Sequence, residues 1–207
     1  MASSSDISDA SRSSTLKINY SVSKAEAVLT DNEVPMYKVD FRLKAPHIVV
    51  TSPSEINPIG TGSVHTVRID ADYEIHGRKG TLKALKRFKS RYTYLSHAFS
   101  DTDSPVPMTW TGDMTLKKWN FVSLDERKMP VAKLSLNIWA TKKVGNIEFL
   151  GSRAAARDAR DELVVTGMTL FLCLSYRANS LVSFFGAFFA RPGPIEQDAE
   201  TVKSTKT

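Results

Sequence analysis

A run of 14 uncharged residues, 163–176, most constrains the fold of this 207-residue chain. Large apolar side chains fall on every side of a helix built through the run. Such a helix is surrounded by protein or by lipid, because a surface helix keeps one polar face. The sequence therefore predicts a helix that is buried along its length. Its predicted core residues are Leu163, Val164, Met168, Leu170, Phe171 and Leu174.

Residues 163–190 also have the composition of a membrane segment. Arg177 separates two uncharged runs, 163–176 and 178–190, and neither reaches the ~18 residues that span a bilayer. Inserting a central Arg costs roughly 2.5–3.5 kcal/mol, whereas the Leu, Val and Phe side chains together contribute about −4 to −8 kcal/mol. Polar residues such as Asn179 reduce that gain, and insertion would deprive the rest of the chain of a core partner. We therefore expect a helix buried in protein and keep the membrane segment as the alternative.

Short strand-like segments precede the apolar run. They alternate apolar and polar side chains or are rich in β-branched residues, and turn residues separate them every 8–12 residues. This pattern is typical of an antiparallel sandwich or barrel rather than an alternating α/β fold. The predicted strands are residues 16–22, 36–43, 47–51, 64–69, 119–124, 131–139 and 145–150.

Two segments favour other or mixed structure. In residues 78–95, Leu82, Leu85 and Phe88 have helical spacing, but the surrounding strands favour a strand or a single helical turn. Residues 153–162 are rich in Ala, Arg and Asp and favour helix.

A helix that is apolar on all sides and follows many strands fits inside a closed barrel. An α-helix with its side chains is ~10–12 Å across, and a barrel of more than eight strands has room for it. The sequence thus predicts a mainly β fold, a closed antiparallel barrel enclosing a C-terminal hydrophobic helix. We expect one domain over residues 15–192, with a disordered Ser-rich tail at 1–14 and a polar one at 193–207.

Several short motifs occur in a fixed order along this chain. They are VPMYKV at 34–39 with Pro46-His47, WTG at 110–112, KWNF at 118–121 with VAK at 131–133, and DELVVTG at 161–167. With the β-rich body and the apolar helix, they resemble the tubby C-terminal-like superfamily over roughly residues 15–190. That superfamily includes LURP-one-related proteins, phospholipid scramblases and many uncharacterised fungal proteins.

The resemblance implies a barrel of about twelve strands around a central helix. It also implies binding of phosphoinositide headgroups by Lys and Arg on the outer face of the barrel. No position-specific basic motif of the family can be matched here, so the resemblance assigns no binding residue. The calcium segment and the cysteine-rich palmitoylation segment of the scramblases have no counterpart in the sequence, and lipid scrambling is not expected.

The charge pattern gives an independent indication of a lipid site. The net charge is +6 and the pI is about 9.4, which suits acidic partners such as lipid headgroups. Aromatic residues interleave the densest basic stretch, and each Lys or Arg near an anionic surface contributes ~1 kcal/mol. The alternative is a solvated strand edge whose lysines prevent edge pairing. The residues expected at the headgroup site are Arg78, Lys79, Lys83, Lys86, Arg87, Lys89 and Arg91.

We find no catalytic motif in the sequence and predict no cofactor and no metal site. The single Cys173 lies in the apolar run and is expected to be a small buried hydrophobe. The histidines lack a second ligand at the spacing of zinc sites. Asp70 and Asp72 alternate on one strand face and could bind a cation, but a surface pair is the expectation.

The functional prediction is a non-enzymatic, intracellular protein, because the N-terminus shows no signal-peptide pattern. It would be cytoplasmic or peripheral at a membrane and would bind anionic phospholipid headgroups, phosphoinositides above all, or a protein partner. Nucleic acid is not the expected partner. One alternative is a membrane-anchored accessory protein that uses residues 163–190. Another is a small-ligand binder or enzyme that uses a cavity of the barrel.

Overall fold

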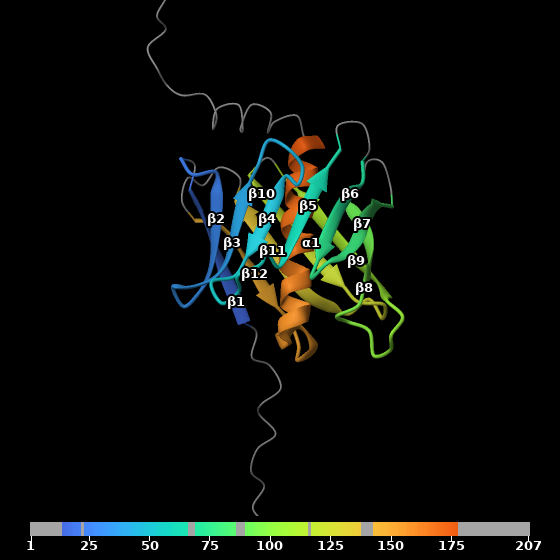
Figure 1. The fold of residues 1–207 in the computed structure, drawn as a ribbon. Helices are drawn as coiled ribbons and strands as arrows, with labels where there is room; N and C mark the ends of the chain where they lie inside the picture. The colour runs from blue at the N-terminus through green and yellow to red at the C-terminus, as the bar shows by residue number, and fades with distance from the viewer. Residues whose placement is uncertain are drawn as a thin grey trace, which may run out of the picture.

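A computed structural model shows twelve antiparallel strands that close into a barrel around one long helix (Figure 1). The structure describes residues 14–21, 23–65, 69–85, 90–115, 117–137 and 143–177. The strands are β1 (Ser14–Ser21), β2 (Glu26–Asp31), β3 (Val34–Phe41), β4 (Ile48–Thr51), β5 (Gly60–Val64), β6 (Ala71–Ile75), β7 (Arg78–Ala84), β8 (Arg91–Ser96), β9 (Val106–Met114), β10 (Lys118–Leu124), β11 (Pro130–Asn137) and β12 (Lys143–Phe149). A 3₁₀ turn, η1 (Arg153–Ala155), leads into α1 (Arg157–Arg177). The predicted fold class is confirmed.

The strands form a simple meander. Each one pairs with its neighbours in sequence, and β1 closes the barrel on β12 through pairs such as Leu16 with Ile147. Alternate residues face inward, so that Tyr37, Val39 and Phe41 on β3 are buried, as their spacing predicts. Leu43 continues the same spacing, but it lies beyond the end of β3 and is exposed. Because the barrel is closed, every strand has a neighbour on both sides, although β7 and β8 pair over only part of their length.

Helix α1 fills the interior of the barrel. Residues 161–175 are all buried, and Figure 1 shows the helix running inside the ring of strands. The six predicted core residues of the helix are among them, as is Cys173. Within the described ranges no helix is long and apolar enough to cross a membrane. Residues 178–190, the second half of the alternative membrane segment, lie outside those ranges.

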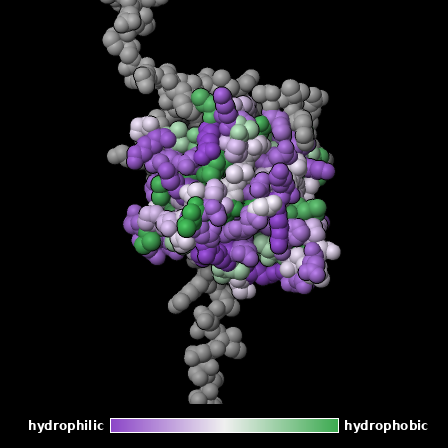
Figure 2. Space-filling model, in the orientation of Figure 1, coloured by the Kyte–Doolittle hydropathy of each residue, from purple (hydrophilic) through white to green (hydrophobic). Residues whose placement is uncertain are grey.

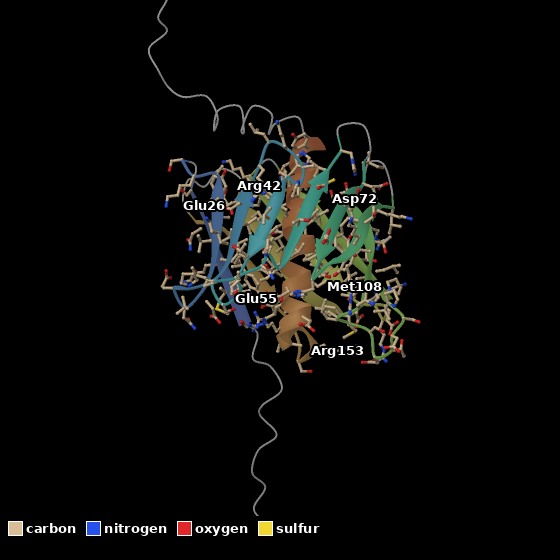
Figure 3. All side chains as sticks on the ribbon, in the orientation of Figure 1. Glu26, Arg42, Glu55, Asp72, Met108 and Arg153 are labelled. Atoms are coloured by element: carbon tan, nitrogen blue, oxygen red, sulfur yellow. The ribbon has the colours of Figure 1, made fainter. Side chains whose placement is uncertain are left out.

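The outer surface of the barrel is polar. Hydrophilic residues dominate the face seen in Figure 2, and hydrophobic ones are scattered over it. Ion pairs hold the chain at the end of the barrel where α1 begins: Arg153 lies 2.9 Å from Asp101, and Arg157 pairs with Glu55. Glu55 and Arg153 are labelled at this end in Figure 3.

The local predictions differ from the structure in position, in number of strands and at the start of the helix. The strand expected at 64–69 begins too late, because β5 spans Gly60–Val64, and residues 66–68 of the expected strand lie outside the described residues. Strands β2, β6 and β9 were not among the predicted strands, and residues 153–156 form η1 and a bend before α1. Residues 78–95 contain β7 and β8, as favoured. The predicted tails fall outside the described residues apart from Ser14, which begins β1.

Candidate binding cavity

The barrel wall is incomplete between β7 and β8. These strands pair at only two positions, Lys83 with Thr93 and Ala84 with Tyr92. The other edges of the same strands pair over longer stretches, since β6 pairs with residues 78–82 of β7, and β9 pairs with all of β8. Beyond the Lys83–Thr93 pair, the two strands therefore separate towards the end of the barrel where α1 begins.

A cavity of about 710 Å³ occupies this separation, and we call it the wall cavity. It runs from outward-facing residues of β7 and β8 to inward-facing residues and to the first turns of α1. Its volume falls within the range of small-ligand sites. Its lining residues are Tyr73, Ile75, His76, Arg78, Lys79, Gly80, Thr81, Lys83, Thr93, Tyr94, Leu95, His97, Ala98, Pro105, Asp158 and Glu162.

Tyr73 bridges the separated strands. A Cβ at Gly80 would lie 2.3 Å from the Tyr73 ring, so only glycine lets this side chain cross β7. The Tyr73 hydroxyl then donates a hydrogen bond to the carbonyl oxygen of Leu95 on β8, at 3.0 Å. The tyrosine thus replaces part of the missing backbone ladder and leaves space beside it. Its ring also packs edge-on against Tyr94, with the centroids 6.0 Å apart.

The outer part of the wall cavity is basic. Arg78, Lys79 and Lys83, three of the seven predicted headgroup residues, line it from β7 and are exposed. Arg91 is exposed on β8 but does not line the cavity. The remaining three predicted residues, Lys86, Arg87 and Lys89, lie outside the described residues.

The inner part of the wall cavity is acidic. Asp158 and Glu162 are one helical turn apart on α1 and both line the cavity. Glu162 is only 6% exposed; its Oε2 accepts a hydrogen bond from the backbone N–H of Ala98 at 3.4 Å, whereas its Oε1 has no partner among the described residues. The hydroxyl of Tyr94, which is 2% exposed, likewise has none in the described chain.

Burial raises the pKa of the Glu162 carboxyl, because the charged form loses its solvation. Hydrogen bonding from Ser96 and from the backbone of Ala98 acts in the opposite direction but is the smaller influence. The native state therefore binds this proton more tightly than the unfolded chain does, and a charged Glu162 destabilises the fold.

We expect Glu162→Gln to stabilise the protein above the folded-state pKa, by on the order of 1 kcal/mol. The wild type loses stability as pH rises from the ordinary value of 4.5 through the raised native pKa, whereas the glutamine does not titrate. The gain should therefore grow with pH across this window and then level off. Chemical denaturation of both proteins at a series of pH values measures it, and a pH-independent difference would contradict it.

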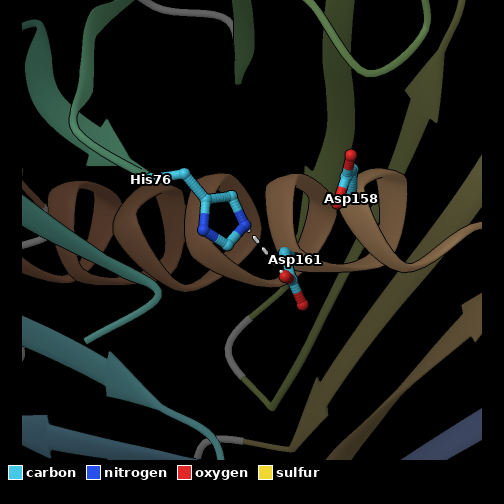
Figure 4. A group of neighbouring side chains, drawn as sticks. All are labelled: His76, Asp158 and Asp161. Atoms are coloured by element: carbon cyan, nitrogen blue, oxygen red, sulfur yellow. Dashed lines mark hydrogen bonds and ion pairs between the residues drawn. The ribbon is translucent and has the colours of Figure 1, made fainter. Parts of the chain in front are cut away.

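A second polar group adjoins the cavity on the same helix face. The β6–β7 hairpin turns at His76 and Gly77, both with positive φ, as a two-residue type I′ turn requires. This turn directs His76 at α1, where its Nε2 donates to Asp161 Oδ2 at 3.0 Å, while the Tyr37 hydroxyl donates to Asp161 Oδ1 at 2.8 Å. Figure 4 shows the histidine over Asp161, with Asp158 one turn away.

His76, Asp158 and Asp161 each offer a ligand atom, and these atoms lie within 4.8 Å of one another. Three such ligands suit a divalent cation with open coordination positions. The two hydrogen bonds to Asp161 already account for its buried charge within the protein. Asp161 therefore has a structural role without an ion: through His76 and Tyr37 it fixes the start of α1 to the β6–β7 turn and to β3.

Sequence reasoning missed the acidic and aromatic half of this site. His76 and Asp161 are 85 positions apart, so no local spacing connects them. The sequence feature that could have predicted it is the acidic pair Asp161-Glu162, which directly precedes the apolar run of the helix. A charge on a buried helix needs a hydrogen-bond or ion-pair partner elsewhere in the protein. Asp72, considered as a cation ligand with Asp70, accepts hydrogen bonds from His65 and Thr81 on the barrel surface instead.

Comparison of the chain with protein-family models, with curated proteins and with solved structures found no match. The wall cavity and its residues are thus the observations on which a function can be argued, and the resemblance to the tubby-like superfamily stays a prediction.

Proposed function

We propose that this protein belongs to the tubby-like proteins and binds anionic phospholipid headgroups, phosphoinositides among them, at a membrane surface, with the headgroup in the wall cavity. The observation that carries the proposal is the meeting of Arg78, Lys79 and Lys83 at one cavity. These three cations form no ion pair with any residue that the structure describes. Unpaired cations at a concave site favour a phosphate, which accepts several charge-assisted hydrogen bonds.

The surroundings of the cavity suit a membrane surface. Leu95 lines the cavity from the outer face of β8 and is 59% exposed. Leu85 follows the last residue of β7, does not line the cavity and is 50% exposed. Exposed leucines beside lysines can enter the boundary between headgroups and acyl chains while the charges contact phosphates. A protein partner, the other expectation from the sequence, would need no basic cavity of small-ligand size.

Flotation of the full-length protein with anionic vesicles tests the proposal. The double variant Lys79→Gln/Lys83→Gln should weaken vesicle binding by roughly 30-fold, since each lysine contributes ~1 kcal/mol. The matched control is Lys117→Gln/Lys118→Gln, which removes the same charge from exposed lysines that do not line the cavity. We expect at most about a twofold loss for this control.

Three outcomes would contradict the proposal. Equal losses in the two double variants would mean that net charge alone drives binding. Absence of flotation would favour a protein partner. Flotation that resists high salt would favour the membrane-anchored alternative, because headgroup contacts at an exposed site are screened by salt.

A further inference from the structure

The two ends of the wall cavity carry opposite charges that do not neutralise each other. Arg78, Lys79 and Lys83 lie on β7, and Asp158 and Glu162 lie on α1. No ion pair joins the two sets within the described part of the chain. A cavity with separated and unpaired charges is complementary to a ligand that carries both signs.

The inner end has specific requirements. Glu162 and Tyr94 line the cavity, and two of their polar atoms, Glu162 Oε1 and the Tyr94 hydroxyl, are buried without a hydrogen-bond partner among the described residues. A phosphate is repelled here, because Asp158 and Glu162 are both carboxylates. An apolar group would leave the two buried polar atoms unsatisfied. A primary ammonium has three donors and a positive charge, and it can bond to the carboxylate and to the hydroxyl oxygen at once.

We propose that the wall cavity recognises a headgroup with a primary ammonium as well as a phosphate, and that the serine headgroup of an anionic aminophospholipid is its ligand. The ammonium binds Glu162, Asp158 and Tyr94, and the phosphate binds the basic residues of β7. This inference rests on the proposed function and narrows it to one class of lipid. Free O-phosphoserine shares the chemistry, so the experiment has to separate the two sources.

Vesicles of equal charge isolate the contribution of the ammonium. Phosphatidylserine and phosphatidylglycerol each carry one net negative charge, but only the first has an amine. At equal mole fraction and salt, and with a chelator present, the full-length wild type should prefer phosphatidylserine by roughly tenfold, as expected for a charge-assisted hydrogen bond in a buried site. The preference should fall to near one in Glu162→Gln.

Two further variants keep the result interpretable. Asp158→Asn changes an exposed residue of the same site and should reduce the preference without a risk to folding. Glu126→Gln removes an exposed carboxylate from the turn after β10, far along the chain from the cavity residues, and should leave binding to both lipids unchanged. Soluble O-phosphoserine should displace the protein from phosphatidylserine vesicles more effectively than glycerol phosphate does.

The possible negative results separate a failure of this inference from a failure of the proposed function. Equal binding to the two lipids by the wild type, or stronger binding to a phosphoinositide at matched charge, overturns this inference and leaves the proposed function standing. Binding that disappears with the chelator also overturns it, because a cation at His76, Asp158 and Asp161 would then hold the phosphate. Tight binding of O-phosphoserine without flotation overturns the lipid as the source. Absence of binding to either vesicle overturns the proposed function itself.

Discussion

Gly62→Val is expected to destabilise the barrel by at least about 3 kcal/mol. Gly62 faces α1 from β5, and a Cβ there would lie 2.2 Å from Thr169 Oγ1 and 2.8 Å from the Ile48 side chain. Neither neighbour can move far, since both are fully buried. For a domain of this size, the midpoint of thermal unfolding should fall by roughly 6–12 °C. Circular dichroism during heating measures it.

Two companions make this test specific. Thr61→Val, at the neighbouring position of β5, places the same valine side chain on the outward face, where it only exchanges a hydroxyl for a methyl group, and should change the midpoint by less than about 2 °C. Thr169→Ala in the Gly62→Val background removes the nearest clashing atom and should restore part of the loss. If Gly62→Val and Thr61→Val unfold at the same temperature, α1 does not pack on β5 as described.

Gly62 and the nearby Gly60 explain why the sequence pattern does not predict the correct position of β5. Gly60 and Gly62 have the composition of a loop, and the strand was therefore predicted to begin later. In the structure they are strand residues, because Val165 and Thr169 of α1 approach the backbone of β5 closely. Local preference could not show this, since the cause is a tertiary contact with residues about 100 positions away. The apolar helix itself was predictable, because every residue of the run 163–176 is uncharged and apolar side chains fall on all sides of the helix.

The candidate site, like the fold, was predictable from the sequence only in part. Its basic part was predictable, because Arg78, Lys79 and Lys83 stand close together in one stretch. Its acidic part was not, because Asp158 and Glu162 join it only when α1 enters the barrel. The separation of β7 from β8 also has no sequence signature, since it depends on which strand pairs form.

The motifs that carry the family resemblance have identifiable roles in packing. Tyr37 of the first motif donates a hydrogen bond to Asp161 of the last, at 2.8 Å. Trp119 of the KWNF motif packs edge-on against Phe171, with ring centroids 6.0 Å apart. These residues position α1 inside the barrel, and they do not line the wall cavity. The motifs thus predict architecture, and of the residues that line the wall cavity only Glu162 belongs to a motif, DELVVTG at 161–167.

Trp110→Ala is expected to cost about 3–5 kcal/mol of unfolding free energy, because it empties the largest fully buried side-chain site. The indole ring of Trp110 packs at Gly167, where an added Cβ would lie 3.4 Å away, and its Nε1 donates to Thr166 Oγ1 at 3.1 Å. The wall and the helix are thus joined by one apolar and one polar contact from a single residue. Urea unfolding measures the total loss.

A double-mutant cycle separates the hydrogen bond from the packing. Trp110→Phe removes the N–H and part of the ring, and Thr166→Val removes the acceptor with little change in shape. The second substitution also leaves a buried donor unpaired, so we expect a loss of about 1–3 kcal/mol. The double variant should lose about 1 kcal/mol less unfolding free energy than the two single variants lose together, because it no longer contains the unpaired indole N–H. Strict additivity would mean that the Trp110–Thr166 hydrogen bond contributes nothing to holding α1 in the barrel, and that the indole acts there by its volume alone.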